Sequence, residues 1–472
     1  MNKRFYVTTP IYYVNDTPHI GHTYSTVAAD ILARYHRLMG DETFFLIGTD
    51  ENAKKNEETA LKLNEDTLAY VTRMSQTWKE TWDKLGITYD RFIRTTEEDH
   101  LEAVLKFFDL VQKNDDIYEG EYKGLYCVGC EDFKTERDLT AEGLCPLHNR
   151  KPDEVTEKNY FFRLSKYKEP LLKYFEENLE FIQPEFRQQE IIKLVTDYCE
   201  DFSISRQNQN WGIPFPLDPS QRIYVWFDAL INYLTGVGYS KDEERFGKFW
   251  PADVQIVGKD IMKFHCIYWP AMLLSAGLPL PKKIYAHGFF TINGEKIGKS
   301  LGNTIDPLKL LEEYPFDAIR YYLFSELNFG SDGDFSEDRL KEMYNAKLAN
   351  GLGNLCARIA KLAERCELDL PTNDFNLQDV SASYHESLTE LKFHGALELI
   401  WSQIANLDKK ISDGKIWELS DPDLKPILTE LISELQIIIN ELQPFLPETA
   451  EKLIKQFGGG KVVALAPLFP RK

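Results

Sequence analysis

The sequence predicts a mixed α/β protein with an open parallel sheet, an inserted metal-binding module and a C-terminal all-helical part. Three observations support this fold class. Strand and helix patterns alternate over the first 115 residues, and strand patterns return after residue 222. Four metal-ligating residues lie between these stretches as two closely spaced pairs. From about residue 336, long helical patterns separated by Pro, Gly and Asp take over and favour a helical bundle.

The first predicted strand is the apolar, β-branched run at residues 5–13, and a turn containing His19-Ile20-Gly21-His22 follows it. Free N–H groups and the positive end of a helix dipole at such a turn favour a phosphate, to which two imidazoles can donate hydrogen bonds. Gly21 leaves room for a nucleotide against the backbone. Taken alone, the two histidines would be better explained as a helix cap and a surface residue. The helix that follows is predicted from apolar residues at Val27, Ala28, Ile31, Leu32 and Tyr35.

The second predicted strand covers residues 43–49 and ends at Asp50. The carboxyl ends of parallel strands are where open sheets place ligand-binding groups, so Asp50 is a candidate ligand-binding residue. Further strands of the same sheet are expected at residues 222–227, 254–258 and 284–290.

The inserted module carries two ligand pairs, each with two residues between its members. Three thiols and one imidazole in this spacing are typical of tetrahedral zinc, and a fully protein-ligated site is structural. The alternative, two incidental turns with buried thiols, fits the double spacing less well. The predicted ligands are Cys127, Cys130, Cys145 and His148. The remaining cysteines lack such spacing and are expected to be apolar fillers.

A second charged motif, Lys296-Ile297-Gly298-Lys299-Ser300, lies in a Gly-rich stretch at residues 293–303. Two lysines and a hydroxyl on a mobile loop can clamp a triphosphate, although such a motif alone is more often solvated charge. It is one residue short of a P-loop, because Asn293 stands where the first glycine would be. No Gly-x-Gly-x-x-Gly fingerprint supports dinucleotide binding.

Composition fits a large soluble enzyme of about three domains. The 472 residues are 43% hydrophobic and 28% charged, and the net charge of −20 argues against a generic nucleic-acid binder. No apolar run is long enough to span a bilayer, and the N-terminus has no signal-peptide core. A cytoplasmic protein with no membrane partner is therefore expected.

Both motifs, in this order and context, resemble the two signatures of class I aminoacyl-tRNA synthetases, and the chain resembles the methionyl-tRNA synthetase family over essentially its whole length. The resemblance implies a Rossmann-like catalytic domain in two halves, residues 1–115 and 222–291. It implies a connective insertion with the zinc knuckle at 116–221, the lysine loop and a linker at 292–350, and an anticodon-binding helical domain at 351–472.

The resemblance also implies the reaction. The carboxylate of L-methionine attacks the α-phosphorus of ATP in line, with Mg2+ on the phosphates, and the methionyl-adenylate formed then acylates the 3′ end of tRNA(Met). No covalent enzyme nucleophile is required. His19, His22, Lys296 and Lys299 would be the catalytic residues. ATP would also contact Gly21, Gly258, Lys259, Asp260, His287, Gly288 and Ser300.

Methionine recognition needs an apolar slot for a thioether and an anchor for the α-ammonium group, for which Asp50 is chemically suited. Aromatic rings around sulfur help to select a thioether. The family's methionine pocket corresponds here to Ile11, Tyr13, Asp50, Trp226, Ala229, Tyr233, Ile261, Phe264 and His265. Many relatives have proline where this chain has Leu230, and histidine and glycine where it has Asn52 and Ala53. The variable positions of the lysine loop, here Ile297 and Gly298, also depart from the commonest family pattern.

In the helical part, Asn354, Arg358 and Trp417 match the family residues that bind the CAU anticodon. An amide, a guanidinium group and an aromatic ring suit splayed single-stranded bases. Without the preceding 350 residues, an ordinary helix surface and a packed tryptophan would be the simpler interpretation. The extra C-terminal domain through which some relatives dimerise is not seen, so a monomer is expected.

Other functions are less well supported. Branched-chain synthetases share both signatures but carry a long editing insertion, because one methylene supplies only about 1 to 3 kcal/mol of discrimination. Cysteinyl-tRNA synthetase places its zinc in the active site, which a closed four-ligand set argues against. A small-molecule nucleotidyltransferase needs neither the zinc module nor the long helical part. A non-catalytic paralogue that binds tRNA or a protein is the main alternative, although such paralogues usually lose signature residues.

Overall fold

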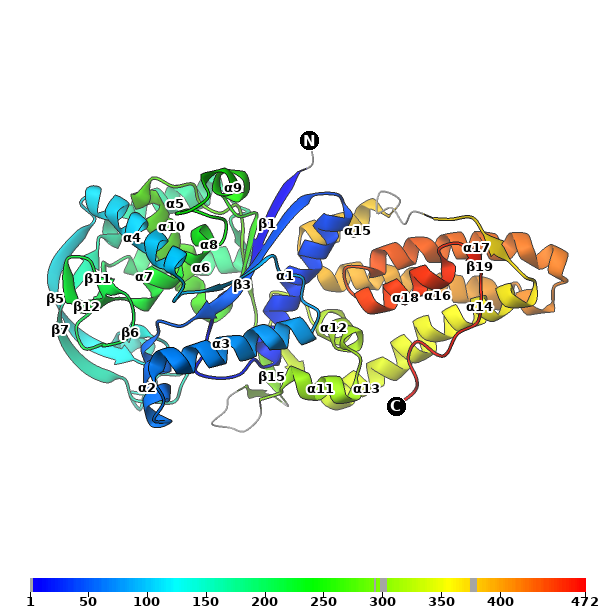
Figure 1. The fold of residues 1–472 in the computed structure, drawn as a ribbon, viewed down its shortest axis with the longest axis horizontal. Coiled ribbons are helices and arrows are strands. Elements are labelled where there is room, and N and C mark those ends of the chain that lie inside the picture. The colour runs from blue at the N-terminus through cyan, green and yellow to red at the C-terminus, as the bar shows by residue number, and fades with distance from the viewer. Residues whose placement is uncertain (1–2, 293, 298–303, 374–379) are drawn as a thin grey trace. The chain divides into compact units, whose positions relative to one another are not determined.

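The computed structural model describes residues 3–292, 294–297, 304–373 and 380–472 (Figure 1). Its backbone divides into two compact units. One unit, here called the sheet unit, contains residues 4–18 and 43–286. The other, here called the helical unit, contains residues 1–3, 19–42 and 287–472. Within the described residues, no helix combines the length and the apolar character needed to cross a membrane.

The sheet unit is built on a parallel sheet, as predicted. The strand order is β2-β3-β1-β13-β14-β8, and β4 also pairs with β3. The pairings of β1 with β13, β2 with β3, β3 with β4 and β14 with β8 are all parallel. The central strands are almost fully buried, as in the apolar stretch of β3, which is typical of a parallel sheet covered on both faces. The strands are β1 (Arg4–Thr8), β2 (Tyr12–Tyr13), β3 (Glu42–Asp50), β4 (Arg91–Arg94), β8 (Ile182–Gln183), β13 (Val254–Gly258) and β14 (Ile284–His287).

Helices connect these strands and supply much of the core. In α4 an apolar stripe at helical spacing is buried, and Phe107 on this stripe packs against the rings of Phe227 and Trp269. The helices of this unit outside the insertion are α2 (Lys54–Lys62), α3 (Thr67–Lys84), α4 (Glu98–Lys113), α7 (Val225–Ala229), α8 (Asn232–Thr235), α9 (Glu243–Phe249) and α10 (Trp269–Ala276).

The insertion is dominated by a long antiparallel ladder between β5 (Ile117–Cys127) and β7 (Asp153–Phe162), flanked by β6 (Asp132–Lys134) and β9 (Phe202–Ser203). Helices α5 (Lys168–Glu177) and α6 (Glu185–Tyr198) follow β7. Between these helices the chain forms β8, so the insertion contributes an edge strand to the parallel sheet. A small antiparallel sheet of β10 (Ser205–Arg206), β11 (Pro214–Phe215) and β12 (Asp218–Ile223) completes this part.

The predicted sheet strand at residues 222–227 is wrong. Strand β12 ends at Ile223 and belongs to the small antiparallel sheet, and the next residues form the short helix α7. The run is apolar and aromatic, and such a short run does not distinguish a buried strand from a buried helical turn. Tertiary packing decides, because Trp226 in α7 stacks on Phe264.

The helical unit begins with α1 (Ile20–Leu38) and resumes at a small sheet of β15 (Phe290–Ile292), β16 (Glu295–Lys296) and β17 (Gly333–Phe335). The strand expected at 284–290 is therefore two strands, β14 and β15. The helices predicted at 347–366, 396–410 and 424–442 are confirmed, the first with a π-helical start at Tyr344–Gly353. The helices are α11 (Pro307–Glu313), α12 (Phe316–Ser325), α13 (Glu337–Met343), α14 (Asn354–Arg365), α15 (Ala382–Thr389), α16 (Phe393–Asp413), α17 (Asp421–Leu442) and α18 (Pro447–Phe457), beside a short pairing of β18 (Asp369–Leu370) with β19 (Gly460–Lys461).

Candidate active site and metal centre

The histidine turn caps helix α1 with both imidazoles. Nδ1 of His19 accepts a hydrogen bond from the Gly21 amide at 3.1 Å, and Nδ1 of His22 accepts one from the His19 amide at 3.2 Å. The two rings stack with centroids 3.7 Å apart. Burial lowers the pKa of His19 to about 4, so its ring is neutral at physiological pH. Because Nδ1 accepts in both rings, each ring carries its proton on Nε2, which suits both imidazoles as donors to a phosphate.

His287 lies against the first turns of α1. Its Nδ1–H donates to the Gly288 carbonyl at 2.7 Å, so its Nε2 accepts from the hydroxyl of Ser25, 2.6 Å away. Burial lowers the pKa of His287 to about 4, which keeps the ring neutral. A Cβ at Gly288 would lie 2.2 Å from the Ser331 carbonyl oxygen, so only glycine fits there. Ser25 could not be singled out from the sequence, because it is one of several small polar residues in α1.

The lysine motif is described only in part. Lys296 ends β16, where its backbone pairs with Thr291 of β15. Lys299 and Ser300 lie outside the described residues. After the motif, the carbonyl of Ile305 accepts a hydrogen bond from the Ile20 amide at 3.0 Å, so this segment meets the start of α1.

In the sheet unit, Asp50 ends β3 and is 3% exposed. Within the described part of the chain, its Oδ1 has no hydrogen-bond partner. Burial and, next, the charge of Asp228 raise the pKa of Asp50 well above its usual value, and Lys55 opposes this shift. A buried carboxylate with an unsatisfied oxygen favours a cationic ligand.

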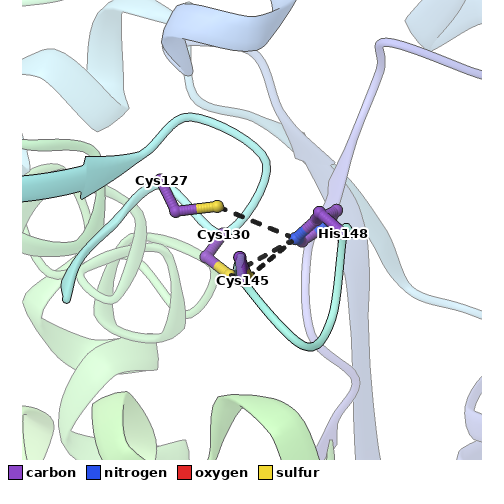
Figure 2. A group of neighbouring side chains, drawn as sticks. All are labelled: Cys127, Cys130, Cys145 and His148. Carbon is purple, nitrogen blue, oxygen red and sulfur yellow. Dashed lines mark hydrogen bonds between the residues drawn. The ribbon is translucent and has the colours of Figure 1, made fainter. Parts of the chain in front are cut away.

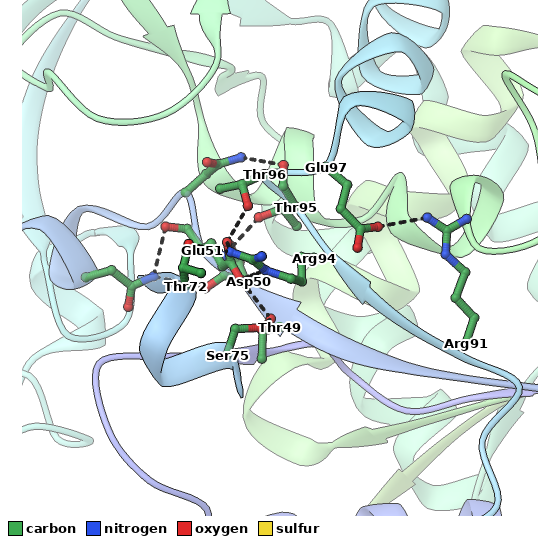
Figure 3. Close-up of polar contacts among 12 residues, drawn as sticks. Thr49, Asp50, Glu51, Thr72, Ser75, Arg91, Arg94, Thr95, Thr96 and Glu97 are labelled. Carbon is green, nitrogen blue, oxygen red and sulfur yellow. Dashed lines mark hydrogen bonds and ion pairs between the residues drawn. The ribbon is translucent and has the colours of Figure 1, made fainter. Parts of the chain in front are cut away.

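The residues that follow Asp50 hold the end of this strand in place (Figure 3). Glu51 receives two hydrogen bonds from Arg94, at 2.7 and 3.0 Å, and another from the hydroxyl of Thr96. Asn52 donates to Asp228 at 2.7 Å and to the Thr95 carbonyl at 3.2 Å. Asn52, where many relatives have histidine, therefore binds a carboxylate buried beside the predicted pocket.

The aromatic residues of the predicted methionine pocket cluster in the sheet unit. Trp226 stacks on Phe264 with centroids 3.8 Å apart, and Tyr13 and His265 meet Trp226 edge-on at 6.4 and 6.0 Å. Tyr233 donates a hydrogen bond to His265 Nε2 at 2.8 Å, because His265 Nδ1–H donates to the Ile261 carbonyl at 3.0 Å. Burial lowers the pKa of His265 to about 4, so this ring is also neutral.

Polar groups without partners also occur in this cluster. Within the described residues, the Tyr13 hydroxyl and Trp226 Nε1 are buried and make no hydrogen bond. Ile11 packs at the edge of the same core and Ala229 is buried in α7. Strand β13 ends at Gly258, where Lys259 and Asp260 begin a 3-10 turn at the carboxyl edge of the sheet.

The four predicted metal ligands converge (Figure 2). Their donor atoms all lie within 4.8 Å of one another. The Sγ atoms of Cys130, Cys145 and Cys127 lie 3.3, 3.8 and 3.9 Å from His148 Nδ1, respectively. Cys130 Sγ is also 3.5 Å from Cys145 Sγ. Tetrahedral zinc with bonds of about 2.0 to 2.3 Å needs donor separations of about 3.3 to 3.8 Å. The residues therefore fit a closed four-coordinate metal site.

The three predicted anticodon residues lie in the helical unit. Asn354 and Arg358 are one turn apart on α14, and Asn354 is exposed. The guanidinium group of Arg358 lies 5.9 Å from the ring centroid of Trp417, which is 45% exposed, and also pairs with Asp408. An exposed tryptophan beside a guanidinium group can stack a base.

Comparison with known proteins identifies the class of protein. A family model described as tRNA synthetases class I (M) matches residues 5–155 and 147–360. Methionine–tRNA ligase of Thermotoga maritima is 43% identical over 96% of this chain and 75% of its own length. Methionine–tRNA ligase of a Nostoc species is 40% identical over 97% of this chain and 90% of its own length. The solved structure of Mycobacterium tuberculosis methionyl-tRNA synthetase in complex with methionyl-adenylate superposes with a TM-score of 0.92 at 35% identity, over 99% of this chain and 100% of that one.

The chain is therefore a class I aminoacyl-tRNA synthetase. Within that class it belongs to the methionine–tRNA ligase family.

Proposed function

We propose that this protein joins L-methionine to tRNA(Met) through methionyl-adenylate, at the expense of ATP. The observation that carries the proposal is a buried carboxylate, Asp50, with an unsatisfied oxygen in the unit that also holds a cluster of stacked aromatic rings. An anionic group and an apolar aromatic wall are what an amino acid with a thioether side chain requires.

On the methionine side, Asp50 would accept hydrogen bonds from the α-ammonium group. Trp226, Phe264 and Tyr13 would surround the side chain, and sulfur–aromatic contacts contribute about 0.3 to 1.5 kcal/mol each. Neutral His265, held in one tautomer by Tyr233 and Ile261, would present a fixed ring rather than a charge. An uncharged wall avoids repelling the substrate ammonium group.

On the nucleotide side, His19 and His22 would donate from Nε2 to the phosphates, and Lys296 and Lys299 would neutralise charge on the leaving pyrophosphate. Gly258, Lys259, Asp260, His287, Gly288 and Ser300 would line the rest of the ATP site. Mg2+ bound to the phosphates would supply further charge neutralisation. A methionine carboxylate oxygen forms the new bond to the α-phosphorus as the bond to pyrophosphate breaks. The terminal ribose hydroxyl of tRNA then attacks the methionyl carbonyl and AMP leaves.

The Cys3His cluster would hold one structural zinc ion, because protein groups supply all four ligands. We also propose that residues 351–472 bind the anticodon, through Asn354, Arg358 and Trp417.

Metal analysis of the purified protein should find one zinc ion per chain. The variant Cys145→Ser should lose it, and its unfolding midpoint should fall because metal binding contributes to the stability of the knuckle. The matched control is Cys366→Ser, a cysteine in the helical unit, which should keep the full zinc content. Equal zinc content in all three proteins would contradict the assignment.

Amino-acid-dependent ATP–pyrophosphate exchange tests the function. We expect exchange with methionine and none with leucine, isoleucine, valine or cysteine. Lys299→Ala should abolish most of the exchange, because that variant lacks a positive charge that would stabilise the leaving pyrophosphate.

The other outcomes of this assay separate the remaining functions. Exchange with a different amino acid would preserve the class and overturn the specificity. No exchange by folded, zinc-replete protein would favour a non-catalytic paralogue, in which case binding of tRNA(Met) without aminoacylation should be measurable.

A further inference from the structure

Lys55, in the first turn of α2, lies among the groups of the proposed methionine site without having been assigned a role. Its Nζ is 3.3 Å from the centroid of the Tyr13 ring. The same ammonium group donates to the Gly129 carbonyl at 3.1 Å, and the Lys55 amide donates to Glu131 at 2.8 Å. The lysine is thus fixed at both its backbone and its charged end.

The Tyr13 ring depends on this contact. Its hydroxyl makes no hydrogen bond within the described residues, so no polar partner fixes the end of this side chain. The ring meets Trp226 only edge-on, at 6.4 Å. A half-buried ammonium group over an aromatic face is a favourable cation–π contact, so Lys55 restrains the Tyr13 ring.

Lys55 also balances buried negative charge. Asp50 is influenced by the carboxylates of Asp228 and Glu131, which both raise its pKa, whereas the charge of Lys55 lowers it. Burial lowers the pKa of Lys55 itself to about 8, and Glu131 and Asp50 counteract this. The lysine is therefore mostly cationic at neutral pH and favours the ionised form of Asp50.

We propose that Lys55 is a positioning residue of the methionine site, which holds the Tyr13 ring and adds a positive charge near Asp50. This inference rests on the proposed function. Lys55 acts through Tyr13 and Asp50, and its effect is on methionine binding rather than on the chemistry at phosphorus.

The test is ATP–pyrophosphate exchange by the full-length, zinc-loaded enzyme carrying Lys55→Met, Lys55→Gln or Lys55→Arg. Lys54→Met, which removes the neighbouring lysine, is the matched control. We expect Lys55→Met and Lys55→Gln to raise the KM for methionine by roughly tenfold or more, because the Tyr13 ring loses its cationic partner and a larger share of Asp50 becomes protonated. The KM for ATP and kcat should change less than about twofold, because the variants lose methionine binding to the same extent in the ground state and in the transition state. Lys55→Arg should restore most of the affinity.

The pH profile separates charge balance from mere packing. Burial and the carboxylates of Asp228 and Glu131 raise the pKa of Asp50, whereas Lys55 and the backbone amide of Asn52 lower it. Without Lys55, Asp50 therefore takes up a proton more readily. The increase in KM for methionine should therefore be larger at pH 6 than at pH 8. Lys55→Gln retains a donor for the Gly129 carbonyl, so it also isolates the charge if Lys55→Met folds poorly.

Two results would overturn the inference. One is an unchanged KM for methionine in Lys55→Gln with its zinc retained. The other is loss of zinc together with a fall in kcat, which would make Lys55 an anchor of the metal knuckle only. If the unmodified enzyme shows no exchange with methionine at all, the proposed function fails first, whatever the variants do.

Discussion

At the scale of single residues, several of the candidate site residues have environments that shift their pKa away from its ordinary value. Three histidines, His19, His265 and His287, have their pKa lowered to about 4 by burial and present neutral rings. Asp50 is buried, and within the described residues its Oδ1 has no hydrogen-bond partner. Such groups reduce the stability of a free protein and are most common where proteins bind ligands.

Replacing Asp50 by asparagine should therefore stabilise the protein and abolish methionine activation. The pKa of Asp50 is higher in the folded than in the unfolded chain, so its ionisation costs stability progressively as pH rises above about 4. We expect Asp50→Asn to raise the unfolding midpoint at pH 7.5, and to raise it by less at pH 5. Thermal unfolding at both pH values checks this.

The control for this experiment is Asp109→Asn, which removes an exposed carboxylate on α4. Its unfolding midpoint should not change with pH in this way. A less stable Asp50→Asn variant at pH 7.5 would show that Asp50 is held by compensating contacts in the free protein.

At the scale of elements, a buried arginine ties helix α1 to the C-terminal bundle inside the helical unit. Arg320 of α12 donates to Asp30 of α1 at 2.6 Å and to the carbonyls of Pro444 and Phe445 at 2.7 Å each. Arg320 and Asp30 are essentially inaccessible to solvent. Since α1 begins at the histidine turn, this cluster fixes the direction of the helix that carries both imidazoles.

We expect Arg320→Met to destabilise the helical unit by about 3 to 5 kcal/mol, because it leaves buried acceptors without their donor. Denaturant unfolding measures this loss. Arg339→Met, which changes an exposed arginine on α13, should have little effect. A loss below about 1 kcal/mol for Arg320→Met would indicate that Arg34, which also pairs with Asp30, compensates.

At the scale of the whole molecule, amino-acid activation and anticodon binding are assigned to different residues along the chain. The net charge of −20 makes broad electrostatic attraction to RNA unfavourable, so tRNA binding requires a local basic surface or specific contacts. Among the three proposed anticodon residues, we test Trp417, because its side chain is exposed beside Arg358 and its removal should disturb the fold little.

Trp417→Ala should lower kcat/KM for tRNA(Met) in aminoacylation by roughly 5-fold to 100-fold, the equivalent of about 1 to 3 kcal/mol for one stacked base. ATP–pyrophosphate exchange should be unchanged, and Trp417→Phe should retain part of the tRNA affinity. Equal aminoacylation by Trp417→Ala and the unmodified protein would remove Trp417 from the proposed anticodon site.

Much of the fold and of the candidate site could be predicted because the signals are local. The spacing within residues 127–148 places four ligands together whatever surrounds them, and the structure brings their donor atoms together. The histidine turn follows from a strand pattern running into a helix pattern, and Asp50 from its place at the end of an apolar strand. Helical periodicity likewise indicated the long helices α14, α16 and α17.

The sequence by itself thus determined the fold class, the candidate metal ligands and the family, because short runs of neighbouring residues carry each of these signals. Tertiary structure alone decided that residues 225–229 form a helix rather than a strand, that Ser25 meets His287, and that Lys55 lies over the Tyr13 ring. The contacts of Ser25 and Lys55 join residues that are distant in sequence. The apolar run at 225–229 is compatible with either a strand or a helix. Packing settles them, because burial and the pairing of buried polar groups depend on every neighbour in space.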